Sequence, residues 1–358
     1  MNIAIDGPVG AGKSRVADEV AARLGILHLD TGAMYRAVGL AVAKAGIDAQ
    51  DESAVTALGL AFPIQNIQIG FGTGIGVGVN ALLSKSLGEG NRERANRAAG
   101  NGIFLMLVAV ALFMLFGAFG ARPFYAMQTD VEDVVNGGTA YTSICCLLTL
   151  GIFVEVMGER LLQASGRTIY TLFTQGTGAI LNILLDPLFI FGFEPLGIPA
   201  MGIAGAAVAT VIGQWVAAIM AVIFNMTRNP DVQFGLKFLR PNGEISRIIL
   251  SVGIPSVLMM AIGSVMNFGM NQILLGFGAI GLVGSAVFGL YFKLQSFVFM
   301  PVFGLNNACI SIIAYNFGAR QPKRITGAIR LTLVTALAIM LFGMALFLLI
   351  PETLMGFF

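Results

Sequence analysis

The chain has 358 residues, of which 56% are hydrophobic and only 11% are charged, and its net charge is +2. Soluble proteins carry about 25% charged residues, so this composition excludes an ordinary soluble protein and predicts a chain solvated mainly by lipid. The three cysteines lie in apolar runs and the single histidine stands alone, which excludes a cysteine or histidine metal cluster. We expect no nucleic-acid partner.

The first fifty residues differ from the rest because they contain no long apolar run, and we expect no signal peptide. Residues 7–14, Gly-Pro-Val-Gly-Ala-Gly-Lys-Ser, match the phosphate-binding motif G-x-x-x-x-G-K-[ST] between a strand-like segment and a helical pattern. The glycines would let backbone N–H groups wrap the ATP phosphates, Lys13 would act as the catalytic cation, and the Ser14 hydroxyl would hold Mg²⁺. A glycine-rich turn that matches by chance is the alternative. The expected residues for ATP and Mg²⁺ are Gly7, Gly10, Gly12, Lys13 and Ser14.

Two stretches around this motif, Ile-Ala-Ile-Asp-Gly-Pro at 3–8 and Leu-Asp-Thr-Gly-Ala-Met-Tyr-Arg at 29–36, resemble the opening of bacterial cytidylate kinase. The resemblance implies that Thr31 bonds a pyrimidine nucleotide and that Arg36 binds its phosphate, so CMP or dCMP would be the substrate if this head works. For Arg36 alone, a solvated helix charge is the alternative. The resemblance covers about 53 residues and lacks the arginine-bearing lid. Because phosphoryl transfer depends on charge neutralisation, we expect no working kinase.

From residue 54 onward the chain is apolar, and no charge occurs between Ser53 and Ser84. Runs of at least ~20 apolar residues predict a mainly α, polytopic membrane bundle. Alternate glycines from Gly70 to Gly78 predict that its first span is only weakly helical, and Pro301 is expected to bend the seventh. We predict two parts, a P-loop α/β fragment at 1–53 and a membrane part at 54–358. The eight expected spans are 56–84, 98–121, 135–160, 168–190, 200–225, 248–275, 281–316 and 328–350.

The loops between these spans alternate in charge. Basic residues gather in every second loop, whereas the other loops are acidic or neutral. By the positive-inside rule the basic loops are cytoplasmic, in a multi-pass protein of the inner (plasma) membrane. The first span would then start outside, and the N-terminal head with it. The bases that set this orientation are Lys85, Arg92, Arg94, Arg97, Arg167, Arg228, Lys237, Arg240, Arg247, Arg320, Lys323 and Arg324.

One short segment occurs twice. Residues 87–94, Leu-Gly-Glu-Gly-Asn-Arg-Glu-Arg, and residues 317–324, Phe-Gly-Ala-Arg-Gln-Pro-Lys-Arg, both join one span to the next through a basic loop. The two copies therefore have the same orientation. Parallel repeats of this kind build two pseudo-symmetric halves around a central cavity, which is typical of transporters.

Several separated motifs resemble the multidrug and toxic compound extrusion (MATE) transporters. They cover about 300 residues, at 57–65, 74–81, 161–167, 182–190, 202–210, 293–297 and 315–319. The resemblance implies two six-helix lobes that export cationic or amphipathic compounds in exchange for H⁺ or Na⁺. Of these helices the chain would hold the second to the ninth, so we expect an incomplete antiporter. A (d)CMP kinase is the alternative function, and whether the chain is an enzyme stays open.

Charged residues inside the spans are functional candidates, because burying an unpaired charge in a membrane is costly. The transport candidates are Glu155, Glu159, Asp186 and Lys293. For the two glutamates we favour pairing with neighbouring spans over ion coupling. Asp186 would be a helix-terminus feature, with transport as the alternative. Lys293 would either face a cavity or extend toward the membrane surface.

Overall fold

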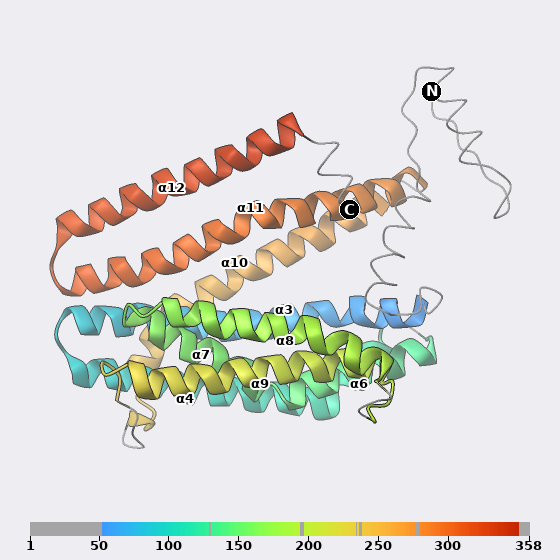
Figure 1. Ribbon diagram of the computed structural model, residues 1–358, viewed down its shortest axis with the longest axis horizontal. Coiled ribbons are helices and arrows are strands. Elements are labelled where there is room, and N and C mark those ends of the chain that lie inside the picture. The colour runs from blue at the N-terminus through green and yellow to red at the C-terminus, as the bar shows by residue number, and fades with distance from the viewer. Residues whose placement is uncertain are drawn as a thin grey trace, which may run out of the picture.

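The computed structural model describes residues 52–128, 130–193, 197–233, 235, 238–275 and 279–350. Within them the regular elements are helices, apart from one antiparallel bridge between Phe193 and Ile198 (Figure 1). This confirms the mainly α class. The predicted P-loop head, with Gly7, Gly10, Gly12, Lys13, Ser14, Thr31 and Arg36, lies outside the described residues. The elements are α3 (Glu52–Gly88), α4 (Arg92–Leu115), the π-helix η1 (Phe116–Gly120), α5 (Ala121–Ala126), α6 (Glu132–Leu147), α7 (Leu150–Ala164), α8 (Ile169–Phe191), α9 (Gly202–Arg228), α10 (Gly243–Leu275), α11 (Ala279–Gly318) and α12 (Pro322–Leu349).

The predicted weak helicity of the first span is wrong, because α3 is a continuous helix of 37 residues. Its alternate glycines form two stripes with the i, i+4 spacing of a helix face. Gly70, Gly74 and Gly78 meet α10, and a Cβ on Gly74 would lie 2.8 Å from the Gly253 carbonyl oxygen. Gly72 and Gly76 meet α7 instead. Small residues let membrane helices approach closely, so this packing offsets the low helix propensity of glycine.

The third predicted span, 135–160, is not one straight helix. It consists of α6 and α7, which are bent by 45° where they meet. The Thr149 side chain lies in this break, is fully buried and accepts a hydrogen bond from the Gln68 amide of α3. The break therefore places a polar group of the third span against the central helix.

Six described segments are long and apolar enough to cross a membrane, and the bent pair α6–α7 makes a seventh if it counts as one span. These correspond to seven of the eight predicted spans. The remaining prediction, 248–275, falls on the helix α10, which does not meet the same criteria over its described residues. Pro301 lies inside α11, whose candidate span is Val298–Gly318.

Many large apolar side chains face outward, as a lipid environment requires. On α12, Leu331 is 70% exposed and Leu348 is 72% exposed, and on α9, Met226 is 73% exposed. Apolar surface this extensive is rare on soluble monomers. The structure therefore supports the predicted membrane location.

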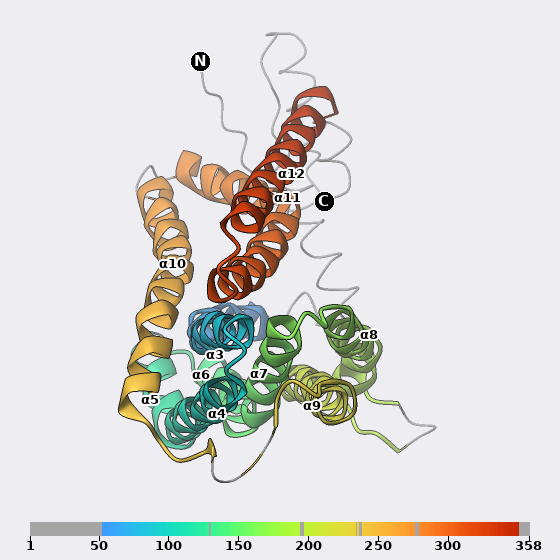
Figure 2. The same ribbon diagram turned by 90° about the vertical axis from the view of Figure 1, so that its left-hand side faces the viewer.

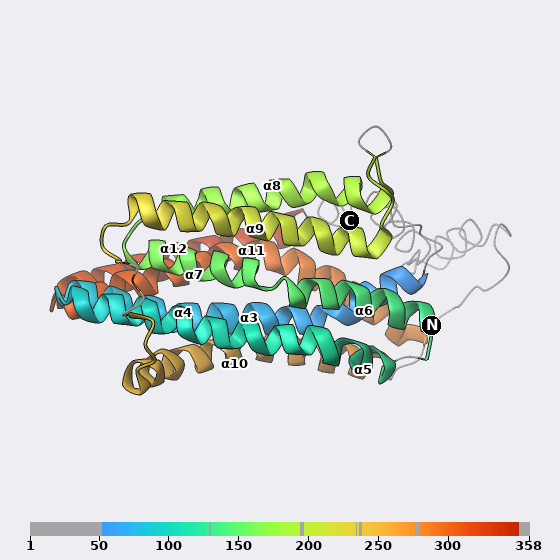
Figure 3. The same ribbon diagram turned by 90° about the horizontal axis from the view of Figure 1, so that it is seen from below.

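The helices form two groups (Figure 2). The helices α4 and α6–α9 pack together on one side of α3, whereas α11 and α12 lie on its other side and α10 flanks it. Seen from below, the long helices run roughly along one axis (Figure 3). The turns after α3, α7, α9 and α11, which carry the basic residues, lie at the same end of this bundle (Figures 1 and 3). The positive-inside rule predicts that this basic end is cytoplasmic.

The predicted parallel repeat is visible in the backbone of two turns. In the first turn the N–H of Glu89 donates to the Lys85 carbonyl and the N–H of Asn91 donates to that of Ser86. In the second turn Ala319 and Gln321 make the same bonds to Tyr315 and Asn316, 230 residues later. Both turns contain one residue with positive φ, Gly90 at 72° and Arg320 at 53°. The two segments thus have the same conformation as well as similar sequences.

Candidate functional site

The first half of the chain contains a polar pocket between α7, α8 and α9. Two glycines bring the walls together, since a Cβ on Gly213 of α9 would lie 2.9 Å from the Gly178 carbonyl oxygen of α8. The pocket has a volume of about 270 Å³. Five of its eight lining residues have polar side chains, although it lies between membrane spans. The lining residues are Glu155, Gln175, Gly178, Ala179, Asn182, Thr210, Gly213 and Gln214.

At one end of this pocket Asn182 connects α8 to α9. Its side-chain amide donates to the Asp186 carboxylate one turn along the helix, at 3.2 Å, and to the Thr210 hydroxyl of α9, also at 3.2 Å. Asp186 makes no ion pair with any residue in the described part of the chain. The site therefore combines carboxylate, amide and hydroxyl oxygens in a membrane span, which are the ligand types that hard cations prefer.

At the other end of the pocket the two glutamates of α7 have different surroundings. Glu159 is 4% exposed, and its carboxylate accepts hydrogen bonds from the Thr174 hydroxyl at 2.7 Å and from the Gln175 amide at 2.9 Å. Both partners belong to α8, the neighbouring span. Glu155 lines the pocket and has no hydrogen bond or ion pair with any described residue. The expected interhelical partners are therefore present for Glu159 and not observed for Glu155.

Next to Glu159, Arg160 is 8% exposed and turns toward α3. Its side chain passes over Gly76, where a Cβ would lie 2.7 Å from the arginine Cγ. The guanidinium donates to the Gln163 side chain at 2.9 Å. Arg160 thus packs between two helices and does not enter the pocket lining.

Only part of this site was predictable from the sequence. Glu155 lines the pocket, and Glu159 and Asp186 adjoin it through hydrogen bonds from lining residues. Lys293 lies on α11 in the other helix group, and its side chain is outside the described residues. Thr210 and Gln214 were not predicted. A signal was present, since both lie with Gly213 on one helix face at i, i+3 and i+4 spacing.

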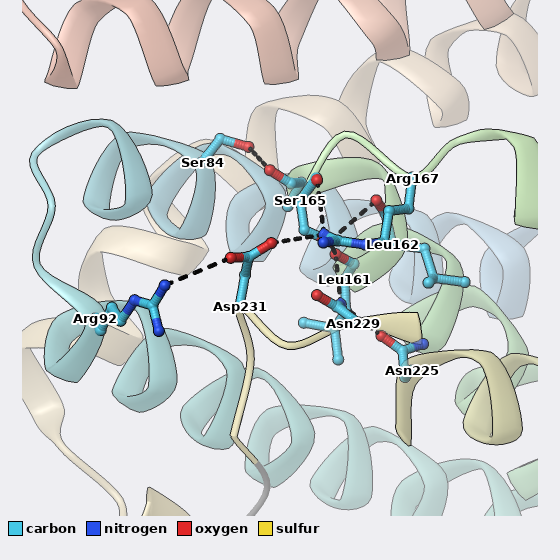
Figure 4. Close-up of polar contacts among 10 residues, drawn as sticks. Ser84, Arg92, Leu161, Leu162, Ser165, Arg167, Asn225, Asn229 and Asp231 are labelled. Carbon is cyan, nitrogen blue, oxygen red and sulfur yellow. Dashed lines mark hydrogen bonds and ion pairs between the residues drawn. The ribbon is translucent and has the colours of Figure 1, made fainter. Parts of the chain in front are cut away.

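A second polar network ties helices together at the basic end (Figure 4). Asp231 lies between two arginines, 2.6 Å from the Arg167 guanidinium and 4.0 Å from that of Arg92. Behind it Asn229 and Asn225 are buried and donate to the Leu161 and Gly158 carbonyls of α7. The network fixes α9 and its following loop against α4 and α7.

We expect Asp231→Asn to lower the free energy of unfolding by about 1 kcal/mol, because the Asp231–Arg167 contact is a charge-assisted hydrogen bond that is only partly exposed. Thermal unfolding of the purified protein measures this change. Glu93→Gln is the matched control, since the Glu93–Arg97 pair is similarly short, at 2.7 Å, but its side chains are 69% and 52% exposed. Equal melting temperatures for Asp231→Asn and the unmodified chain would contradict the structural role.

Comparison with known proteins gives two matches in different parts of the chain. The MatE family profile matches residues 40–188 and 255–358, and the cytidylate kinase profile matches residues 3–75. The two ranges overlap between residues 40 and 75. Helix α3 begins within this overlap, at Glu52.

Curated relatives include the multidrug export protein MepA of three staphylococci. The chain is 24% identical to that of Staphylococcus saprophyticus over 308 residues, which is 86% of this chain and 66% of the relative. It is 24% identical to the Staphylococcus haemolyticus protein and 25% identical to the Staphylococcus aureus protein, with coverage of 75% and 76% of this chain. The chain spans 58% and 59% of the length of these two relatives.

Solved structures of similar fold include a multidrug resistance MATE family transporter in an outward-facing conformation, with a TM-score of 0.80 and 24% identity. The match covers 96% of this chain and 73% of that one. A MATE structure in a straight conformation also gives a TM-score of 0.80, at 24% identity, over 91% of this chain and 72% of that one.

Proposed function

Because the chain belongs to the MatE family and is a multi-pass protein of the plasma membrane, we propose that it exports small cationic or amphipathic molecules in exchange for H⁺ or Na⁺. The profile match covers most of the membrane part, and the curated relatives are multidrug export proteins. The partners of this activity are the lipid bilayer and a small-molecule substrate. The N-terminal head and the transporter part would divide near residues 53 and 54.

The observation that carries this proposal is the polar pocket between α7, α8 and α9. Glu155 lines it with no partner among the described residues, and Asp186 adjoins it through Asn182. A carboxylate inside a membrane is costly unless a cation or a proton neutralises it. Both carboxylates are therefore suited to bind and release a cation, either the coupling ion or a positively charged substrate.

Export also requires that access to the pocket changes sides, and the contact of α3 with α11 is suited to this. Ser311 of α11 donates to the buried Asn80 of α3 at 2.9 Å. Near the basic end the two helix backbones touch, since a Cβ on Gly88 would lie 2.0 Å from the Tyr315 carbonyl oxygen. Toward the other end, α11 and α12 diverge from α3 (Figure 1). A rigid-body motion of the two helix groups around this contact would close one end of the bundle while it opens the other.

The proposal is tested by accumulation of a fluorescent lipophilic cation in cells that lack other efflux pumps. We expect cells producing the chain to accumulate less dye than cells with an empty vector, and we expect a protonophore or removal of Na⁺ to abolish the difference. Equal dye accumulation, with the protein present in the membrane fraction, would contradict export.

Glu159→Gln is expected to reduce the yield and thermal stability of the protein without changing its H⁺ or Na⁺ dependence. The substituted amide is neutral, and the Thr174 hydroxyl can turn to accept from its NH₂ group, so the contacts to Thr174 and Gln175 remain only as weaker, uncharged hydrogen bonds, at a cost of about 1 kcal/mol. Yield after size exclusion and the melting temperature measure this effect. A normal yield together with lost ion dependence would assign Glu159 to ion coupling instead.

A second candidate function, (d)CMP kinase activity, is supported by the cytidylate kinase match at residues 3–75. Gly7, Gly10, Gly12, Lys13 and Ser14 would hold ATP and Mg²⁺, and Thr31 and Arg36 would bind the nucleotide. The match ends at residue 75, and most of the residues after it belong to the transporter match.

We therefore expect purified chain to phosphorylate CMP no faster than its Lys13→Ala variant, in an assay with ATP and Mg²⁺. Binding of ATP through Lys13 is compatible with this result. A turnover of about 1 s⁻¹ or more, which is typical of kinases, that disappears in Lys13→Ala would instead establish the kinase function.

A further inference from the structure

A second groove lies at the basic end, where α3 ends beside the turn between α11 and α12 (Figure 1). We propose that it binds the phosphate headgroup of an anionic phospholipid of the cytoplasmic leaflet. The proposal rests on the membrane location of the chain and not on its export activity. The groove has a volume of about 810 Å³, and its lining residues are Lys85, Glu89, Phe317, Gly318, Arg320, Gln321, Pro322 and Ile325.

The charges at this groove leave a positive surplus. Glu89 is neutralised from two sides, by Lys85 at 3.8 Å and by Arg94 at 3.4 Å. The Lys85 ammonium is also held 5.2 Å from the centre of the Phe317 ring, which fixes it beside the turn. Arg320 adds a guanidinium that forms no ion pair with any described residue. Basic pockets of this type between membrane helices suit anionic headgroups.

The first copy of the repeat serves as an internal comparison. There, each arginine has an acidic partner, since Arg92 pairs with Asp231, Arg94 with Glu89 and Arg97 with Glu93. The second copy has no acidic residue near it in the sequence, because none occurs between Glu244 and Glu352. Two turns with the same backbone bonds thus differ in charge, since the arginines of the first copy have acidic partners, some of them shared, whereas the bases of the second copy form no ion pair with any described residue. These bases are Arg320, Lys323 and Arg324.

Arg320 occupies a backbone conformation that favours glycine. Its φ of 53° corresponds to the φ of 72° at Gly90, the equivalent residue of the first copy. An arginine is strained at this position, and the turn needs no side chain there, as Gly90 demonstrates. A ligand bound by the Arg320 side chain would explain why an arginine, and not a glycine, stands at this strained position.

The apolar part of the lining favours a lipid over free phosphate. Phe317 is 61% exposed, and Pro322 and Ile325 continue the apolar surface along α12 toward outward-facing leucines. A lipid would place its phosphate between Lys85 and Arg320 and its glycerol and acyl chains along this surface. Inorganic phosphate would use the two cations alone.

The test is titration of the purified full chain in neutral detergent with fluorescent phosphatidylglycerol, compared with phosphatidylcholine. The variant carries Arg320→Gly and Lys85→Gln. Glycine suits the backbone at 320, so the turn is expected to keep its shape, which the melting temperature of Arg320→Gly alone verifies. The control is Arg97→Gln, which removes a paired base of the first copy.

We expect the double variant to bind phosphatidylglycerol at least about tenfold more weakly, while Arg97→Gln binds it like the unmodified chain. Phosphatidylcholine and excess inorganic phosphate should not displace the lipid. Unchanged binding in the double variant, equal weakening in Arg97→Gln, or displacement by phosphatidylcholine would overturn the proposal. Complete displacement by inorganic phosphate would exclude a lipid as the specific ligand and identify a site for free phosphate.

Discussion

Asp186→Asn is expected to slow export by about tenfold or more and to remove its dependence on the H⁺ or Na⁺ gradient. The substitution keeps the shape of the side chain but removes the negative charge. A hydrogen bond or ion contact to a charged group contributes about 1.5–3 kcal/mol, and 1.4 kcal/mol corresponds to a factor of ten. Because Asp186 lies in a membrane span next to the pocket, we expect the loss of this interaction energy to weaken ion binding.

Export rates in vesicles, measured with and without the gradient, test this expectation. The yield and melting temperature of the variant must be compared as well, so that a folding defect is not mistaken for lost coupling. Glu132→Gln is a suitable control, because Glu132 is an exposed carboxylate that pairs with Arg122 at 3.3 Å at the start of α6. Export by Asp186→Asn at the unmodified rate, with the same gradient dependence, would exclude Asp186 from coupling.

Alanine at either glycine of the α3–α11 contact is expected to force the two helices apart. A Cβ on Gly88 would lie 2.0 Å from the Tyr315 carbonyl oxygen, and a Cβ on Gly318 would lie 2.1 Å from the Lys85 carbonyl oxygen. Backbone atoms cannot move aside as a flexible side chain can, so each substitution should cost about 1–3 kcal/mol. We expect lower melting temperatures and a contact that opens more often.

Opening is measured by the reaction of a thiol reagent with Ser311→Cys, in a background carrying Cys309→Ala. Ser311 is only 8% exposed and bonds to Asn80 across the contact, so its labelling rate should rise in Gly88→Ala and Gly318→Ala. The control is Gly327→Ala on α12, where a Cβ has nothing within 4 Å and should stabilise the helix by about 0.5–1 kcal/mol. Equal labelling in all variants would show that these glycines do not hold the contact closed.

The sequence contained enough information for seven of the eight predicted spans and for the repeat. Their signals are local, since a run of apolar residues or a basic turn is visible without knowing its neighbours. The repeat at 87–94 and 317–324 is the strongest example, because the two turns share backbone hydrogen bonds and a positive φ. The glycines of α3 were misinterpreted for the opposite reason. Their propensity is a local property, whereas their close contacts with α7 and α10 are tertiary.

The site was predictable only in part, because partners from other helices decide the role of each charge. Glu155 and Glu159 lie one helical turn apart and have the same side chain. One is satisfied by Thr174 and Gln175, and the other lines a pocket with no partner among the described residues. Only the packing of α7 against α8 separates them. Thr210 joins the site for the same reason, through Asn182 of the neighbouring helix.

The most direct test of the export function is transport by the purified chain in liposomes. The chain is reconstituted with a fluorescent cation, and either a pH gradient or a Na⁺ gradient is imposed. We predict that dye moves against its own gradient when one of the two ion gradients runs in the opposite direction, and that reversing the ion gradient reverses the dye flux. Dye movement that is the same in protein-free liposomes, or that depends on neither ion gradient, would contradict ion-coupled export by this chain.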